Sequence, residues 1–215
     1  MSAEHWQFIA QGVGMTLWLT LTSGLLSLAV GILLGVLRTA PLAPLRALAA
    51  GYTEFFRNIP LLTVLFFIYY GVPIALRKSG LPQLDGVTRA ILALGLYTGA
   101  YVGEVIRAGL GTVSKGNLEA ARSLGLSYVQ MIRYVQLPQA LRVAIPPLGT
   151  LLIALLKNTA LAGTISVADL LFQAELVRDR TFIDTLLIAG ALYVAMTLPL
   201  GAVVNAAERR WAIQR

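Results

Sequence analysis

Cysteine is absent from this chain of 215 residues, and histidine occurs once, at His5. Without cysteine the chain can form neither disulfides nor thiolate metal sites. A single histidine in a short N-terminal tail also excludes a histidine-rich metal centre and a plausible catalytic triad. The sequence therefore offers little of the chemistry on which hydrolases and metalloenzymes depend.

Charged side chains are scarce as well: they make up 13% of the residues, against 57% hydrophobic ones. Continuous apolar runs of about 20 residues are typical of transmembrane helices. The runs predict an all-α, polytopic membrane protein with five transmembrane helices, at residues 13–37, 58–76, 88–112, 143–168 and 185–207. The first 12 residues contain no Lys or Arg, so we expect the first span to be retained and not to act as a cleaved signal peptide.

Lysines and arginines predict the orientation of these spans, because cytoplasmic loops are enriched in them. With the N-terminus outside and the C-terminus inside, the inner segments carry eleven basic residues, the outer segments five, and Lys157 lies within a span. The opposite topology would reverse this bias, so we expect N-out, C-in. The positive side chains behind the net charge of +7 then flank the spans, where they can meet anionic lipid headgroups. We therefore expect no nucleic-acid partner.

The loops between the spans are short, so we expect a single transmembrane domain over residues 1–215. Residues 45–56 predict an amphipathic helix along the inner membrane surface, and residues 169–184 predict a short surface helix outside. Neither loop is long enough to form a second domain.

Small residues recur at Gly95, Gly99 and Gly103 in the third span, and at Gly31 and Gly35 in the first. In lipid, such Gly-x-x-x-Gly faces let two helix backbones approach closely. Two interpretations remain open: packing between helices of this chain, or an interface with another subunit along the third span.

Two groups of polar residues lie within the predicted spans. Glu104 and Arg107 are three residues apart on the third span, and Lys157, Asn158 and Thr159 lie about halfway along the fourth. Ionisable residues at such depth usually face a bundle interior or an aqueous cavity. The first group is consistent with a structural ion pair or with a functional site, whereas three adjacent polar residues in the second favour a functional site.

No nucleotide-binding loop can be recognised in the chain. Gly109, Gly111 and Gly116 have an approximate spacing, but the Gly-Lys-Ser/Thr ending is missing, Lys115-Gly116 has the reverse order, and no strand precedes them. We therefore expect no ATPase activity, no metal and no cofactor in this chain.

A basic, amphipathic loop precedes the fourth span. Asn117 is expected to cap a short helix that ends at Gly125. Ser127 and Gln130 have the spacing of a capping box for a second helix, which Pro138 is expected to end. Two short helices in a cytosolic loop offer a surface to a cytosolic partner.

This loop, at residues 114–138, resembles a known family. Glu119-Ala120-Ala121, Gly125 and Val135-x-Leu137-Pro138 resemble the EAA loop of permeases of binding-protein-dependent ABC importers, with Val135 in place of Ile. The resemblance implies a type I ABC importer (MetI-like) permease fold and a cytoplasmic coupling loop. Its ATPase-coupling residues would be Glu119, Ala120, Ala121, Gly125, Leu137 and Pro138.

Further segments are similar to the polar amino acid uptake subfamily (His/Glu/Gln/Arg/opine type), namely Tyr52–Leu62, Tyr101–Gly109 and Leu137–Arg142. In Lys157-Asn158-Thr159-Ala160-Leu161, Asn158 stands where many members have Asp, and this form resembles one subunit of glutamate/aspartate importers. A site with Lys157 and no adjacent carboxylate suits an acidic side chain. Because a partner permease can supply a carboxylate, basic and neutral polar substrates (arginine, histidine, glutamine) stay open.

The resemblance also implies partners in a bacterial plasma (inner) membrane. Two permease subunits, identical or homologous, would form the pathway, a dimer of ATPase subunits would bind the loops and the ATP, and an extracytoplasmic amino-acid-binding protein would deliver the substrate. ATP-driven alternating access would then move an amino acid past a site around Tyr101, Glu104, Arg107, Lys157, Asn158 and Thr159.

Two other classes explain the sequence less well. A secondary transporter driven by an ion gradient through Glu104 and Arg107 is disfavoured, because five spans without an inverted repeat are too few for the usual architectures. A membrane scaffold that only recruits a cytosolic partner would explain the loop but not the polar residues at Lys157.

Overall fold

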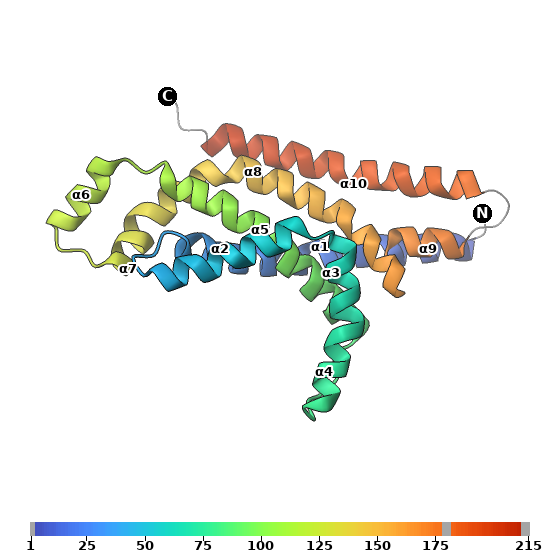
Figure 1. The fold of residues 1–215 in the computed structure, drawn as a ribbon. Coiled ribbons are helices and arrows are strands. Elements are labelled where there is room, and N and C mark those ends of the chain that lie inside the picture. Colours follow the sequence, from blue (N-terminus) through green and yellow to red (C-terminus); the bar gives the residue numbers. More distant parts are fainter. Residues whose placement is uncertain (1–2, 178–181, 212–215) are drawn as a thin grey trace.

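The structure is a computed structural model, and it describes residues 3–177 and 182–211. Within these two ranges the regular elements are all helical (Figure 1). In chain order they are α1 (Ala3–Leu37), α2 (Ala43–Asn58), α3 (Leu61–Phe66), η1 (Phe67–Gly71), α4 (Val72–Lys78), α5 (Gly86–Gly111), α6 (Lys115–Ser123), α7 (Tyr128–Met131), η2 (Ile132–Gln136), α8 (Leu137–Asn158), η3 (Thr159–Ile165), α9 (Leu170–Leu176) and α10 (Phe182–Trp211). Of these, η1 and η2 are π-helical and η3 is a 3₁₀ helix.

Five helical segments of the described chain are long and apolar enough to cross a membrane. They are Glu4–Leu37, Leu61–Lys78, Gly86–Gly111, Tyr128–Ile165 and Leu186–Arg209. The predicted all-α class and the five predicted spans are therefore confirmed. The N-out, C-in orientation stays a prediction. Arg178, Arg180 and Arg215, which contribute to it, lie outside the described residues.

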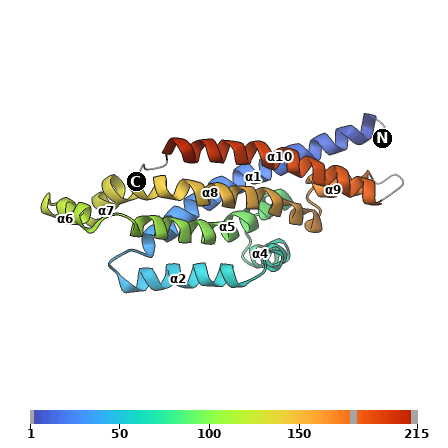
Figure 2. The ribbon, with the colours of Figure 1, turned by 90° about the horizontal axis from the view of Figure 1, so that it is seen from above.

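The long helices α1, α5, α8 and α10 run along one common direction (Figures 1 and 2). The loop with α6 and α7 lies at one end, called here the inner end, and α9 lies at the other, the outer end (Figure 1). Helix α5 is the centre of the bundle, because it contacts α1, α2 and α8. The segment from α3 to α4 instead points away from the bundle, and Figure 2 views α4 end-on.

Glycines on α1 and α5 allow these two helices to pack closely. A Cβ atom on Gly95, Gly99 or Gly103 would meet side chains of α1, at Leu26, Val30 and Leu34. Conversely, Gly31 and Gly35 of α1 receive side chains of α5, at Val102 and Ile106. The glycine faces therefore pack within the chain, as the first of the two interpretations predicted, and the interpretation as a subunit interface along this face is wrong because α1 occupies it.

Helix α2 does not lie along the inner surface as residues 45–56 predicted. It runs beside α5, with Ala49 and Thr53 buried (Figures 1 and 2). The Tyr52 hydroxyl donates to the Leu96 carbonyl oxygen at 2.9 Å, and burial raises the pKa of Tyr52 to about 12. The amphipathic pattern was real, but its small-residue face packs against α5 instead of meeting lipid headgroups.

The bend between α2 and α3 has a local cause. Pro60 follows Ile59, and proline disfavours helical backbone in the residue before it. Ile59 accordingly has extended dihedral angles, φ −108° and ψ 139°. The chain resumes as α3 in a new direction, and Phe67, Tyr70 and Ile74 on this segment are exposed.

The loop between α5 and α8 differs from prediction where its first helix begins and where its second helix was expected to end. Ser114, not Asn117, caps α6: its hydroxyl accepts from the Asn117 backbone N–H at 3.3 Å. Gly125 follows α6 with φ +75°, and the capping box of Ser127 and Gln130 is present, as predicted. Pro138 does not end the second helix, because α7 continues through the π-helical turn η2 into α8; Pro138 then lies in the first turn of α8, where its missing N–H is tolerated.

Candidate functional site

The inner half of the bundle holds a cluster of charged side chains. Glu104 on α5 accepts from Arg38 (Nη1 to Oε2, 3.1 Å) and from Arg107 (Nε to Oε1, 3.0 Å). These side chains are only partly buried, with 19%, 27% and 40% of the Arg38, Glu104 and Arg107 side chains exposed. Sequence reasoning found the pair of Glu104 and Arg107 but missed Arg38, because nothing in the sequence states that the end of α1 lies beside Glu104.

A second arginine that sequence reasoning did not assign to the site extends this cluster. The Arg57 guanidinium, at the end of α2, lies over the Tyr101 ring with 5.8 Å to the centroid. Tyr101 shares a 3.0 Å hydroxyl–hydroxyl hydrogen bond with Tyr97, one turn earlier on α5. The face of an aromatic ring attracts a cation electrostatically, and among the described residues no carboxylate forms an ion pair with Arg57. Arg57 is also close enough to act electrostatically on Glu104, so three arginines surround one glutamate.

The polar residues at the end of α8 separate into two environments. Lys157 is exposed and Asn158 is half-buried, but Thr159 is fully buried and donates to the Leu156 carbonyl oxygen at 2.7 Å. Among the described residues, no carboxylate forms an ion pair with Lys157. Lys157 and Asn158 can therefore meet a solute, whereas Thr159 is turned into the protein.

The charged cluster and Lys157 do not lie at the same depth. Leu155, two residues before Lys157, packs with Leu94 of α5. Glu104 is ten residues further along α5, which corresponds to about 15 Å of helix. Tyr97 lies between the two groups, since its ring packs on the cluster of Leu94 and Leu155 while its hydroxyl contacts Tyr101. The structure thus brings together Tyr101, Glu104 and Arg107, but it keeps them apart from Lys157 and Asn158.

The residues predicted to contact an ATPase lie at the inner end. Glu119, Ala120, Gly125 and Pro138 are exposed there. Ala121 is 4% exposed, and Leu137 packs against the α5–α8 core. Leu124, next to Gly125, is 81% exposed. An apolar residue in a polar loop indicates a contact residue, but Leu124 was not among the predicted coupling residues.

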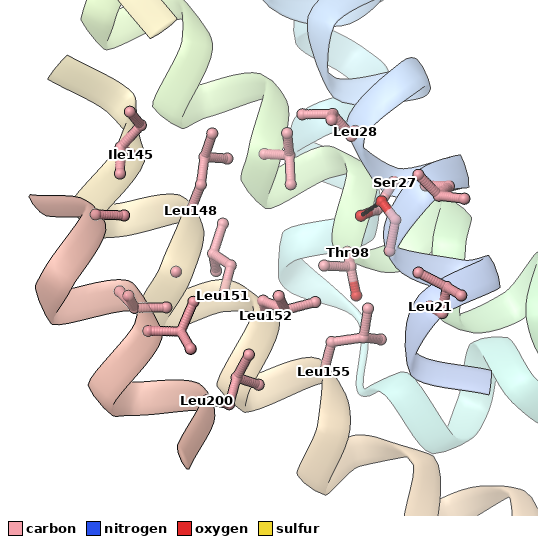
Figure 3. Close-up of a pocket in the computed structure, with 17 residues that line it drawn as sticks. Leu21, Ser27, Leu28, Thr98, Ile145, Leu148, Leu151, Leu152, Leu155 and Leu200 are labelled. Atoms are coloured by element: carbon pink, nitrogen blue, oxygen red, sulfur yellow. Dashed lines mark hydrogen bonds between the residues drawn. The ribbon is translucent and has the colours of Figure 1, made fainter. Parts of the chain in front are cut away.

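A cavity of about 400 Å³ lies between α1, α5, α8 and α10 (Figure 3). Leucine, valine and other apolar residues form its walls, and Ser27 and Thr98 supply the side-chain oxygens that it has (Figure 3). The charged cluster and Lys157 lie elsewhere. Because burying an unpaired charge is costly, this apolar cavity does not fit a polar solute.

Residues 6–213 match the family described as "Binding-protein-dependent transport system inner membrane component". The probable glutamine ABC transporter permease protein GlnM of Bacillus subtilis is 41% identical over 186 residues, which cover 86% of this chain and 84% of that protein. The glutamate/aspartate import permease protein GltK of Escherichia coli is 33% identical over 210 residues, which cover 95% and 94%.

Two solved structures resemble the fold. A crystal structure of an amino acid ABC transporter has a TM-score of 0.83 at 34% identity, covering 96% of this chain and 95% of the other. An inward-facing structure of the MetNI methionine ABC transporter also has a TM-score of 0.83, covering 99% and 100% of the two chains, but at 22% identity this likeness concerns the fold alone. The MetI-like fold that was predicted is therefore confirmed.

Proposed function

We propose a substrate class and a set of partners for this chain, which belongs to the family of binding-protein-dependent transport system inner membrane components and is a multi-pass permease subunit of an ABC importer. The importer carries polar amino acids, in the first place glutamate and aspartate. The relatives described above are named as amino acid permeases, which supports the broader class. The narrower substrate rests on the side chains of this chain.

Lys157 carries the proposal of an acidic substrate. Its side chain is exposed at the end of α8, Asn158 beside it is uncharged, and no described carboxylate pairs with it. A substrate carboxylate can therefore form the charge-assisted hydrogen bond that the protein leaves open. Arg57 and Arg107 add positive charge along the same pathway, and Glu104 is the one acid of their cluster in the part of the chain that the structure describes.

Glutamine is the second candidate, and one observation favours it: the relative at 41% identity is named as a probable glutamine permease. The Asn158 side chain carries both a hydrogen-bond donor and an acceptor, as a substrate amide requires. In that case Lys157 or Arg57 would bind the α-carboxylate that both substrates share.

The partners follow from the family. ATP hydrolysis belongs to separate ATPase subunits, which dock on residues 114–138, and a second permease subunit completes the pathway of the single domain at residues 1–215. The exposed Glu119, Ala120, Gly125 and Leu124 provide the docking surface. A binding protein delivers the amino acid at the outer end.

Uptake by the reconstituted transporter tests the substrate. We expect ATP-dependent uptake of labelled glutamate that excess aspartate blocks and excess arginine does not. Uptake of glutamine without competition by aspartate would favour the second candidate, and uptake of arginine alone would contradict both.

Two matched variants test the role of Lys157. Lys157→Gln should raise the KM for glutamate about ten- to a hundredfold, since a hydrogen bond to a charged group contributes about 1.5–3 kcal/mol. Lys78→Gln, which removes an exposed cation from the end of α4, should leave the KM unchanged. Equal KM values for the two variants would remove Lys157 from the site.

A further inference from the structure

A buried carboxyl group lies at the outer end of the bundle, apart from the site described above. Asp169 is 0% exposed and precedes α9, whose first backbone N–H groups donate to it from Leu171 (3.3 Å) and Phe172 (3.1 Å). The Tyr193 hydroxyl on α10 donates to Asp169 Oδ2 at 3.1 Å. Among the described residues, no cation pairs with Asp169. Its charge is thus held by neutral donors only.

Four elements meet at this carboxyl group. Thr16 on α1 accepts from the Leu170 backbone N–H at 3.1 Å, and the hydroxyls of Thr16 and Thr159 lie against that of Tyr193. Thr16 and Thr159 are both 0% exposed. We call Thr16, Thr159, Asp169 and Tyr193 the outer polar junction; it joins α1, the start of η3, α9 and α10.

Close backbone packing surrounds the outer polar junction. A Cβ atom on Gly163 would lie 3.0 Å from Asp169 Oδ1, and one on Gly12 would lie 2.8 Å from the Leu170 Cα atom. Water therefore has little room beside the carboxyl group while the junction is closed. For the same reason, no water molecule can replace a hydrogen bond that Asp169 loses.

The outer polar junction is connected directly to the solute-facing residues. Thr159 follows Lys157 and Asn158 without a break in the chain, and its buried hydroxyl lies against that of Tyr193. The position of Asn158 relative to α1 and α10 therefore depends on whether the junction is closed. Transport requires the outer end to admit a solute, and this requirement is the part of the argument that rests on the proposed function.

Protonation changes the free energy of the closed junction. Burial raises the pKa of Asp169 from 3.8 to about 6, although the donors from Phe172, Leu171 and Tyr193 lower it; Glu175 on α9 raises it further. Among the described residues, Glu175 and Tyr193 are the titratable groups that act on Asp169, and the neighbouring side chains of α1 and η3 are the hydroxyls of Thr16 and Thr159. Asp169 thus binds its proton more tightly in the closed junction than when it is hydrated. Acid pH therefore stabilises the closed junction, and this stabilisation is lost as the pH rises from about 4 to about 6.

We propose that Asp169 is a positioning residue that holds the outer end closed around the Lys157–Asn158 turn, and that loss of its proton loosens this closure. The outer polar junction then acts as a pH-sensitive latch. The outer end opens more often as the pH rises through the range in which Asp169 loses its proton. At higher pH the frequency of opening is constant.

The test uses a single introduced thiol, because the chain has no cysteine of its own. Ala174 on α9 is 1% exposed next to the junction, so the thiol of Ala174→Cys reacts with a water-soluble maleimide only when the outer end opens. The rate is measured on the assembled transporter in proteoliposomes, without ATP or substrate, and is divided by that of Ser79→Cys, an exposed position, to cancel the pH dependence of the thiol. We expect this ratio to rise about tenfold between about pH 5 and pH 7.

Two further variants separate titration from packing. Asp169→Asn keeps an oxygen acceptor but cannot titrate, so its ratio should not change with pH. Tyr193→Phe keeps the carboxyl group and removes a donor that favours the ionised form, so the midpoint should move to higher pH. A flat ratio with Asp169 in place, or the same pH response in Asp169→Asn, would overturn the proposal. Because no substrate is used, an error in the proposed substrate cannot produce either outcome.

Discussion

At the scale of single residues, the charged cluster on α5 is dominated by cations. Glu104 accepts from Arg38 with one oxygen and from Arg107 with the other, so two arginines offset its charge. Among the described residues, no carboxylate forms an ion pair with Arg57, which lies over Tyr101. Under the proposed function, Arg57 is therefore the cation of this cluster that a solute carboxylate can bind.

A glycine at the end of α5 provides the first stability prediction. A Cβ atom on Gly109 would lie 2.8 Å from the backbone oxygen of Ala140, and backbone cannot move aside as a flexible side chain can. Gly109→Ala should therefore lower the free energy of unfolding by about 1–3 kcal/mol, as overpacked core positions do. Thermal unfolding in detergent measures it.

Gly111→Ala, on the same helix, is the matched control, since a Cβ atom there would meet nothing within 4 Å. Its unfolding temperature should stay close to that of the parent chain. Equal losses in both variants would mean that helix backbone effects, and not the contact with Ala140, set the result.

Residue-level sequence reasoning succeeded where the signal is local and failed where it depends on a distant partner. The capping box of Ser127 and Gln130 was predictable because both residues lie within one turn. Asn117 was mistaken for the cap because Ser114, three residues earlier, is an equally good capping residue. Thr159 could not be placed, because its environment is set by Tyr193 on another helix.

At the scale of elements, the loop between α5 and α8 keeps its shape through local interactions. Ser114 caps α6, Gly125 ends it with φ +75°, and Ser127 starts α7. Left-handed backbone costs non-glycine residues roughly 1–2 kcal/mol. The geometry of the loop is thus set within the loop itself, as a docking surface for another protein requires.

Gly125→Ala should therefore impair coupling more than folding. The strained turn would displace Leu124 and α6, so we expect ATP-dependent uptake to fall at least several-fold while the unfolding temperature of the membrane domain changes little. Uptake and ATP hydrolysis are measured together on the reconstituted transporter.

Gly116→Ala, in the first turn of α6, supplies the control, because a Cβ atom there lies in open space and the backbone is not left-handed. Uptake in this variant should remain at the parental level. Parental uptake in Gly125→Ala would contradict the role assigned to the loop.

The helices themselves were predictable from length and apolar content, but their neighbours were not. The glycines of α5 indicated a close contact, yet the same pattern serves contacts within a chain and between chains, so only the structure identifies α1 as the neighbour. Likewise, the amphipathic face of α2 fits a membrane surface or a helix equally well. The family motif, in contrast, predicted the loop and the fold without knowledge of any contact.

At the scale of the whole molecule, the chain has a well-packed part and a part whose apolar side chains are exposed. Over half of the α5 span is buried, but only 22% of the span from α3 to α4. That segment points away from the bundle (Figure 1) and carries exposed Phe67 and Tyr70. A second permease subunit or lipid has to cover it, which agrees with the proposed assembly.

Orientation in the membrane can be tested with the same cysteine-free chain. If the N-terminus lies outside, Ser79→Cys, just after α4, should react with a membrane-impermeant thiol reagent on intact cells. Gly116→Cys, on α6, should react only after the membrane is made permeable. The reverse pattern would overturn the orientation predicted from lysines and arginines.

The length of α8 has a mechanical consequence. It runs for 22 residues, from Leu137 to Asn158, or roughly 33 Å at 1.5 Å per residue. One helix therefore has the loop of residues 114–138 at its first end and Lys157 at its last. Under the proposed function, a tilt of α8 that starts at the docked loop would shift Lys157, and the adjacent Pro146 and Pro147 are the point at which α8 bends most easily.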